Sequence, residues 1–313
     1  MGNDYAIFAD ITCDLSPAIR ERFEVDGYLK SYMSTPESGS GEIEGSLDIS
    51  DTELDAFYVS LKSNKNKYKT ATPSVDEIVA YYETFLCRGK DILALSISGK
   101  LSATYNLMVR AKDIALEKYP ERRIIVVDSM KYSVALGLLT VKACLLRSAG
   151  HPIEQNAEML EKIKNRIHQM GSVDDLFWVA SKGRISHAKA FFGSVAGIKP
   201  MGDFDSDGMV TVLAKVSGYD KVYKTTVEYI KKTITSANKQ IIFVAHSARR
   251  NQAELLANAI RKEVRPKEVI VCNIYPMSGI NAGPGLLAAY YFGTEITDLK
   301  YEKEIITEIV SRL

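Results

Sequence analysis

The chain has 313 residues, 46% hydrophobic and 25% charged, a composition typical of a globular protein long enough for two α/β domains. Lys plus Arg is 40 and Asp plus Glu is 39; the net charge of +1 argues against a large nucleic-acid-binding or membrane-binding face. The chain has no apolar run near the roughly 20 residues of a transmembrane helix, and its four cysteines are scattered. Its first residues lack a basic and an apolar region, so we expect no signal peptide. We therefore expect reduced thiols and a cytoplasmic protein without stable membrane insertion.

Short apolar segments alternate with helical segments in the first half of the chain. The expected strands are Tyr5–Ala9, Asp91–Ile97 and Arg123–Val127, which are short and rich in Ile, Leu and Val. The expected helices include Ser102–Lys118 and Lys131–Ser148. The alternation predicts a three-layer α/β/α domain with a parallel sheet, spanning residues 1–152.

Three short motifs predict further helix starts in this half. Ser16-Pro17 offers an N-cap followed by proline at the first helical position. Ser50-Asp51-Thr52-Glu53 and Ser74-Val75-Asp76-Glu77 both fit the capping box. The Ser- and Gly-rich segment Ser34–Gly45 predicts a surface loop within the domain.

The second half mixes strands and helices in a different order, which predicts an α+β domain with a mixed sheet over residues 153–313. We expect a helix at Ile153–Met170, which would join the domains, and a strand at Asp175–Ala180. A hairpin is expected at Lys199–Val216, turning at Asp207-Gly208. The later expected elements are a strand at Gln240–Ala245, a helix at Asn251–Lys262, a strand at Glu268–Ile274, and a Gly-rich segment Met277–Gly285 leading into a helix from Pro284.

Polar side chains follow the predicted parallel strands at their carboxyl ends, where ligands bind in sheets of this kind. These residues are Asp10 and Thr12, Ser96 and Ser98, and Asp128 and Ser129. They fit either a ligand site or ordinary strand-end and helix-cap positions. The chain lacks a complete phosphate-binding P-loop and a G-x-G-x-x-G turn, and its four histidines show no metal-ligand spacing.

Five short segments resemble motifs of the DegV family and occur in the order that the family has. They are Asp10–Leu15 (D-I-T-C-D-L), Thr70–Ser74 (T-A-T-P-S), Ser96–Tyr105 (S-I-S-G-K-L-S-A-T-Y), Lys182–Ser186 (K-G-R-I-S) with Gly197–Pro200 and Asp207-Gly208, and Gly279–Gly285 (G-I-N-A-G-P-G). Each segment is a weak signal alone. Five in register over nearly the whole chain identify it as similar to that family.

The resemblance implies a lipid-binding protein and not an enzyme acting alone. DegV proteins hold one long-chain fatty acid in a tunnel between their two domains, and some present its carboxylate to the ATP-dependent subunit of a bacterial fatty acid kinase. The implied ligand-binding residues are Thr70, Thr72, Ser96, Ser98, Gly99, Lys100, Asn281, Ala282 and Gly283. The implied partner-docking residues are Lys182 and Arg184. The resemblance implies no catalytic residue, metal or cofactor in this chain.

Hydroxyl groups suit such a head-group site on physical grounds. The acyl tail supplies most of the affinity, at about 0.8 kcal/mol per buried CH₂. The carboxylate then needs only enough hydrogen bonds to offset its desolvation, which serine hydroxyls and N–H groups at a helix start can provide. These neutral donors also leave the carboxylate nucleophilic, as transfer of a phosphoryl group to it requires.

Three residues depart from the DegV pattern. Asn281 stands where relatives have His, Gly99 replaces the second Ser of a Ser-Ser pair, and Ser217 stands where relatives often have Arg. These differences keep two other interpretations open. One is a phosphoryl-transfer or hydrolase enzyme that uses Asp10, Asp14, Ser98 and Asp128, with Lys100 nearby. The other is a diverged binder of a different amphipathic small molecule.

Overall fold

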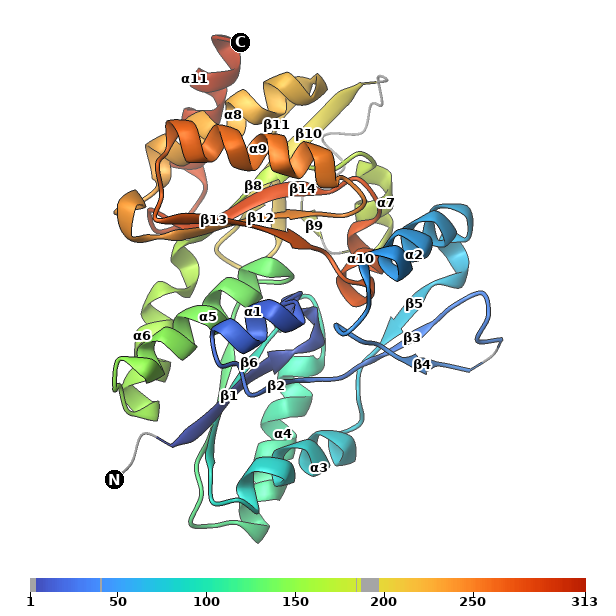
Figure 1. Cartoon of the computed structure of the whole chain (residues 1–313), viewed down its shortest axis with the longest axis vertical. Helices are drawn as coiled ribbons and strands as arrows, with labels where there is room; N and C mark the ends of the chain where they lie inside the picture. The colour runs from blue at the N-terminus through green and yellow to red at the C-terminus, as the bar shows by residue number, and fades with distance from the viewer. Residues whose placement is uncertain (1–3, 40, 184, 187–196) are drawn as a thin grey trace. The chain divides into compact units, whose positions relative to one another are not determined.

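The computed structural model describes residues 4–39, 41–183, 185–186 and 197–313 (Figure 1). The chain forms two compact units. Unit 1 comprises Met1–Ser50 and Asn64–Lys164, and unit 2 comprises Asp51–Ser63 and Asn165–Leu313. In the part of the chain that the structure describes, no helix has both the length and the apolar character needed to cross a bilayer.

This division differs from the expected boundary between residues 152 and 153 at two places. Helix α6 (Ile153–Ile163) belongs to unit 1, because its buried Asn156 amide donates to the Tyr5 hydroxyl and to the Ala143 carbonyl, each at 2.8 Å. Helix α2 (Asp51–Ser63) belongs to unit 2, where the buried Tyr58 hydroxyl donates to the Ile274 carbonyl at 2.6 Å. Long-range hydrogen bonds of this kind leave no trace in the local sequence pattern.

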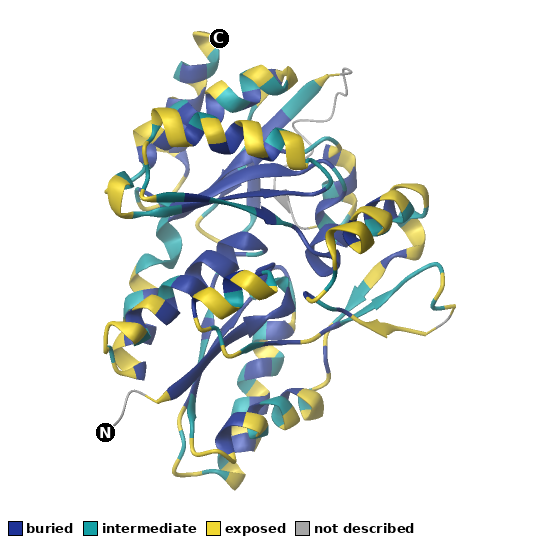
Figure 2. Ribbon diagram, in the orientation of Figure 1, coloured by how far each residue is buried: buried dark blue, intermediate teal, exposed yellow. Residues whose placement is uncertain are grey.

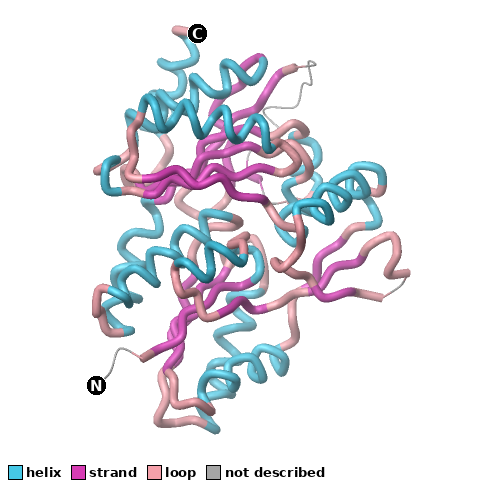
Figure 3. Tube along the Cα trace, in the orientation of Figure 1, coloured by secondary structure: helices cyan, strands magenta, loops and turns pink. Residues whose placement is uncertain are grey.

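Unit 1 is built on a parallel sheet of four strands in the order β2-β1-β6-β7. The strands are β2 (Gly27–Leu29), β1 (Tyr5–Asp10), β6 (Asp91–Ser96) and β7 (Ile124–Asp128). One face packs on α3 (Val75–Leu86) and α4 (Thr104–Lys118) through a core that contains Phe8 and Tyr82. Helices α5 (Val134–Ser148) and α6 pack against β1, β6 and β7. The predicted α/β/α layers and parallel sheet are confirmed (Figure 3).

Two of the predicted helix starts have the expected cap geometry. The Ser16 hydroxyl accepts the Ile19 N–H at 3.3 Å, and Pro17 opens α1 (Pro17–Arg22). Ser74 and Glu77 form a complete capping box at the start of α3. A cap of this kind stabilises a helix by about 1 kcal/mol.

The segment Ser34–Gly45, expected as a surface loop, contains strand residues at both ends. A second sheet of unit 1 has the antiparallel order β4-β3-β5, formed by β4 (Ile43–Glu44), β3 (Tyr32–Ser34) and β5 (Lys69–Ala71). Strand β4 was not predicted, because it is defined by backbone pairing with β3. The Ser- and Gly-rich composition of the segment gives no sign of that pairing.

Unit 2 is built on a mixed sheet of seven strands in the order β13-β12-β14-β8-β10-β11-β9. The strands are β13 (Glu268–Asn273), β12 (Ile241–His246), β14 (Leu287–Phe292), β8 (Ile167–Ser172), β10 (Ile198–Phe204), β11 (Val210–Ser217) and β9 (Ile185–Ser186). Helices α8 (Gly218–Thr233), α9 (Arg250–Glu263) and α11 (Lys300–Ser311) cover it through one large apolar cluster (Figure 2). The predicted mixed sheet and the hairpin of β10 and β11 are confirmed.

In the second half, one expected helix is too long and two expected elements are of the wrong type. The helix predicted to reach Met170 ends at Ile163, and β8 follows. The strand predicted at Asp175–Ala180 is helix α7 (Leu176–Ser181), because the Asp175 carboxylate accepts the Trp178 N–H as an N-cap. The helix predicted from Pro284 is strand β14, and the Gly-rich segment before it contains helix α10 (Pro276–Ala282). A short apolar run such as β14 fits a buried helix or a buried strand equally well.

A buried polar network ties the centre of unit 2 together. The Asp203 carboxylate on β10 contacts His168 Nδ1 on β8 at 2.6 Å and accepts the Tyr229 hydroxyl of α8 at 2.9 Å. It also accepts the Gln169 N–H at 2.7 Å, while His168 Nε2 lies 3.0 Å from the Thr294 carbonyl. His168 and Asp203 are completely buried, so each of these bonds is made without competition from water.

We expect Asp203→Asn to lower the free energy of unfolding by about 2–4 kcal/mol, because an amide cannot replace a carboxylate oxygen toward both His168 and Tyr229. Urea denaturation followed by circular dichroism measures this change. The control is Asp207→Asn, the same substitution at an exposed position in the β10–β11 turn. Equal stability changes in the two variants would contradict the role given to the network.

Candidate ligand-binding site

The carboxyl edge of the unit 1 sheet collects the polar residues that follow β1, β6 and β7. Ser96 and Asp128 are paired in register at the ends of β6 and β7, and β1 ends beside them at Asp10. Asp10, Ser96 and Ser98 are buried. Parallel pairing therefore brings together residues that are far apart in the sequence.

The Asp10 carboxylate joins β1 to the loop that follows β6. It accepts the Ile97 N–H at 2.5 Å, the Thr12 N–H at 2.9 Å and the Thr12 hydroxyl. Burial raises the pKa of Asp10 above its usual range, although these hydrogen bonds act in the opposite direction. Both carboxylate oxygens of Asp10 are thus engaged in holding main chain.

The Asp128 carboxylate plays the same part between β7 and the loop after β6. Its oxygens accept the Gly99 N–H at 3.2 Å and the Met130 N–H at 2.9 Å. A Cβ atom at Gly99 would lie 3.0 Å from Asp128 Oδ2 and 3.4 Å from the Tyr105 ring. The missing side chain at position 99 therefore lets the carboxylate approach, and the N–H expected at the head group donates to Asp128.

Ser98 is the best-placed hydroxyl at this edge. Its N–H donates to the Lys131 carbonyl at 2.8 Å, and its carbonyl accepts the N–H groups of Leu101 and Ser102. Its Oγ accepts the Lys100 N–H at 3.3 Å. The hydroxyl hydrogen has no acceptor among the described residues, and Ser98 is completely buried.

Three residues near this edge have an unusual backbone conformation. Asp14, Met130 and Ser133 have φ values of 52°, 52° and 54°, which L-residues adopt rarely. The Ser133 hydroxyl donates to Asp14 at 2.5 Å. Such residues cost of order 1–3 kcal/mol each and gather at sites whose loops need a fixed shape.

The two threonines expected at the head group lie on the other sheet of unit 1. Thr70 is half-buried on β5, opposite Met33 of β3, and Thr72 is exposed just after β5. Within the described ranges, no hydrogen bond connects either threonine to Ser96, Ser98 or Gly99. Lys100 is exposed next to Ser98. The structure of unit 1 thus groups Ser96, Ser98, Gly99 and Lys100.

The remaining expected residues lie in unit 2. Asn281 is half-buried on α10 and donates to the Met277 carbonyl at 3.2 Å, and Ala282 is buried beside it. Gly283 has a φ of 75° and lies so close to Trp178 that a Cβ would meet the indole at 2.8 Å. Lys182 is half-buried at the end of α7, and Arg184 lies outside the described residues.

Sequence reasoning missed a polar cluster near Gly285. The Asp174 carboxylate accepts Lys199 Nζ at 2.6 Å, the Tyr219 hydroxyl at 3.0 Å and the Arg249 guanidinium. Burial opposes ionisation of Asp174, but the two cations lower its pKa below the usual value. A Cβ at Gly285 would lie 2.4 Å from Asp174, so glycine is needed there. Only Lys199, in the Ile-Lys-Pro motif, carried a sequence signal.

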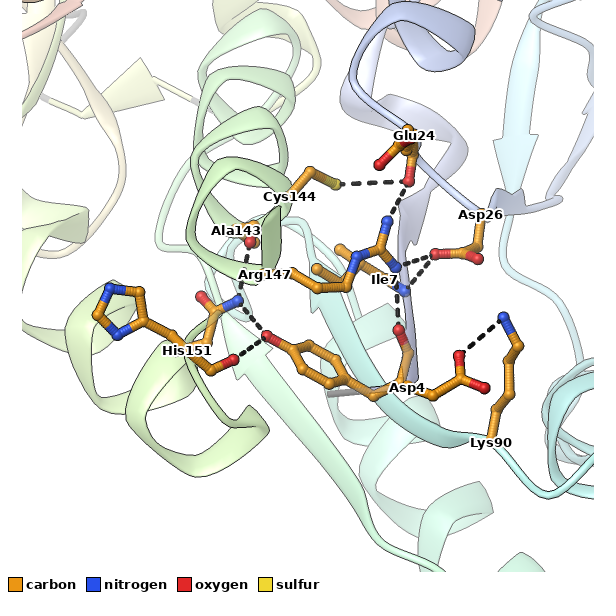
Figure 4. Close-up of polar contacts among 11 residues, drawn as sticks. Asp4, Ile7, Glu24, Asp26, Lys90, Ala143, Cys144, Arg147 and His151 are labelled. Carbon is orange, nitrogen blue, oxygen red and sulfur yellow. Dashed lines mark hydrogen bonds and ion pairs between the residues drawn. The ribbon is translucent and has the colours of Figure 1, made fainter. Parts of the chain in front are cut away.

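A cavity of about 460 Å³ lies at the opposite, amino edge of the unit 1 sheet. Figure 4 shows the polar contacts of the residues around it. Arg147 lines it and donates to the main-chain carbonyls of Tyr5, at 2.9 Å, and Glu24, and to the Asp26 carboxylate. Asp26 in turn accepts the Ile7 N–H at 2.8 Å. The guanidinium fastens the starts of β1 and β2 to α5. In the described residues, no group of three or more His, Cys, Asp or Glu could hold a metal ion.

Comparison with known proteins places this fold in a class of two-domain α/β proteins with one parallel and one mixed sheet. The chain belongs to the DegV family, whose family model matches residues 4–294. A DegV domain-containing protein of Clostridium perfringens is 30% identical over 296 residues, 92% of this chain and 97% of that protein.

Two solved structures share the fold. A DegV family protein from Thermus thermophilus, described by its fatty acid binding, has a TM-score of 0.80 at 22% identity and covers 93% of this chain and 99% of its own. A stearic acid-binding protein from Eubacterium ventriosum has a TM-score of 0.80 at 21% identity, covering 91% and 97%.

We expect Arg147→Ala to lower the free energy of unfolding by about 2–4 kcal/mol, because two carbonyls and a carboxylate lose their donor. Urea denaturation measures the change. Lys90→Ala is the control at the same cavity, since Lys90 makes only a surface ion pair with Asp4, worth about 1 kcal/mol or less. Equal losses in both variants would show that Arg147 does not fasten the sheet.

Proposed function

We propose that the chain is a lipid-binding protein that holds one long-chain fatty acid, with the carboxylate at the carboxyl edge of the unit 1 sheet. Membership of the DegV family supports this, as do the fatty acids bound by the Thermus thermophilus and Eubacterium ventriosum proteins. The observation that carries the proposal is the buried Ser98 hydroxyl, whose hydrogen has no acceptor among the described residues.

The neighbouring groups favour hydroxyl donors at this head-group site. Ser96 Oγ is buried and makes no hydrogen bond of good geometry within the described part of the chain, and it lies close enough to the Asp10 carboxylate to act on the pKa of that group. The Gly99 N–H is already used by Asp128, so the hydroxyl donors in this group are Ser96 and Ser98, with the exposed Lys100 beside them. A buried hydroxyl without a partner is unfavourable by about 1–3 kcal/mol, and a bound carboxylate would remove that cost.

The same contacts disfavour a stand-alone phosphoryl-transfer or hydrolase enzyme. Such a mechanism needs a carboxylate that is free to act as nucleophile or base. Asp10 and Asp128 both hold main-chain N–H groups, and Asp14 accepts the Ser133 hydroxyl. These carboxylates are parts of the scaffold around the serines.

The proposal predicts that protein purified from bacteria releases one fatty acid per chain on denaturation. We expect Ser96→Ala combined with Ser98→Ala to weaken the affinity for the fatty acid at least about tenfold in a titration with a fluorescent fatty acid, since each lost hydrogen bond to a charged group is worth about 1.5–3 kcal/mol. Mass spectrometry of the released molecules measures both the identity and the stoichiometry of the ligand.

The matched control is Thr307→Ala combined with Ser311→Ala, which removes two exposed hydroxyls that bond only within α11. This variant should retain the full amount of lipid. An empty wild-type protein would overturn the proposed function. Unchanged affinity of the Ser96 and Ser98 variant, with native circular dichroism, would overturn the head-group assignment alone.

We further propose that the bound carboxylate is presented to a separate ATP-dependent kinase subunit. Neutral serine hydroxyls support this role, because they leave the carboxylate more nucleophilic than an arginine clamp would. The chain with fatty acid and ATP alone should form no acyl phosphate, whereas addition of the catalytic subunit of a bacterial fatty acid kinase should produce it. Acyl phosphate formation by the chain alone, or its absence with the kinase subunit, would refute this role.

A further inference from the structure

Helix α11 is the last element of unit 2 and packs against α8 and β11. Its apolar residues Ile305, Ile306 and Ile309 enter the large apolar cluster of this unit. Figure 1 shows that the helix carries the C-terminal end of the chain. A terminal helix opens more readily than an internal one, because no later element holds it in place. Docking of α11 therefore depends on its apolar face and on its first turn.

The polar contacts that tie α11 to α8 lie at the surface. Lys232 Nζ is 3.3 Å from a carboxylate oxygen of Glu308, and the Tyr301 hydroxyl donates to the Lys232 carbonyl at 3.3 Å. Exposed contacts of this kind contribute little, because water and salt weaken them. The N-cap residue Leu299 makes no side-chain hydrogen bond to the first turn. These contacts alone do not hold the start of the helix firmly.

Glu302, in the first turn of α11, is the exception to this surface pattern. The residue is only 1% exposed, and both of its carboxyl oxygens are buried. Among the described residues they make no hydrogen bond of good geometry, although the N–H of Glu302 itself lies close enough to act on the carboxyl. A buried carboxylate without a strong partner is unfavourable, whereas the protonated carboxyl is tolerated much better.

Charged groups from neighbouring segments act on Glu302. Burial is the main cause that raises the pKa of Glu302 above its usual value, and the carboxylates of Asp203 on β10 and Asp298 before α11 add to the rise. The N–H of Glu302 and His168 on β8 act in the opposite direction. His168 is a poor counter-ion, because its Nδ1 lies 2.6 Å from Asp203, which offsets any charge on the ring. The surroundings therefore favour the protonated carboxyl.

Two buried tyrosines complete the surroundings of Glu302. Burial is the main reason why the pKa values of Tyr229 on α8 and Tyr291 on β14 are raised, and the charge of Glu302 adds to the rise. Tyr229 donates to Asp203 at 2.9 Å. The one titratable residue of β11, Lys215, is exposed. An ionised Glu302 would thus lie against a buried network that already contains the Asp203 carboxyl.

We propose that Glu302 is a proton-dependent switch for α11, which is firmly docked while the carboxyl holds its proton and loosens when the proton leaves. Below the usual pKa of glutamate, the docked and open forms of the helix both hold the proton. As the pH rises above that value, the open form loses its proton first and becomes relatively more stable, until the pH passes the raised pKa of the docked form. None of these residues belongs to the proposed fatty acid site.

Hydrogen–deuterium exchange of the full chain at about pH 5 and about pH 8, read by mass spectrometry, tests the proposal. Protection factors, which correct for the intrinsic pH dependence of exchange, should fall at least about threefold in α11 peptides at the higher pH. Peptides of the internal strand β12 should change less. Glu302→Gln keeps the shape of the side chain but cannot ionise, so its α11 protection should stay within about twofold between the two pH values.

The matched control is Glu304→Gln, which makes the same substitution at an exposed position of α11. This variant should keep the pH dependence of the wild type. Circular dichroism checks that both variants are folded, and the wild-type comparison decides the question without any substitution. Unchanged α11 protection in the wild type, an equal fall in α11 and β12, or the wild-type pH dependence in folded Glu302→Gln would overturn the proposal.

Discussion

The arrangement of unit 1 depends on buried carboxylates that accept main-chain N–H groups from neighbouring loops. Asp10 fixes the loop after β6, and Asp128 fixes the same loop from the other side. Each carboxylate has been removed from water to a different degree, and each is stabilised by the N–H groups that it holds. The serine hydroxyls between them owe their fixed positions to this pair of contacts.

In the core of unit 2, a buried carboxylate again accepts hydrogen bonds from neighbouring elements. Nearer the surface of unit 2, carboxylates are held by cationic side chains instead. Asp203 joins two strands and a helix from a fully buried position, so its hydrogen bonds operate at low dielectric. Asp174 is only partly buried and is surrounded by two cations, which keep it ionised. Asp51 is exposed and weakly held. The three carboxylates thus range from structural to weakly held according to how far water reaches them.

Much of the fold could be predicted from local patterns, and the failures have a common physical cause. Short strands such as β1 and β6, and the capped helix α3, carry their signals in adjacent residues. Strand β8 contains the buried His168, whose two ring nitrogens contact Asp203 and the Thr294 carbonyl, both far away in the sequence. The serines at the end of β6 were predicted in place, whereas the bond from Gly99 to Asp128 depends on strand order.

The assignment of α2 to unit 2 has a consequence for synthesis of the chain. The polypeptide passes between the units three times, after Ser50, Ser63 and Lys164, so neither unit is a continuous stretch that could be excised. As the chain leaves the ribosome, α2 emerges long before its partner Ile274. Its apolar residues, such as Leu54 and Leu61, must therefore wait through more than 200 residues of translation, as the separation of 216 between Tyr58 and Ile274 requires. During that interval, these apolar side chains have no native partner in the part of unit 2 that follows Ile274.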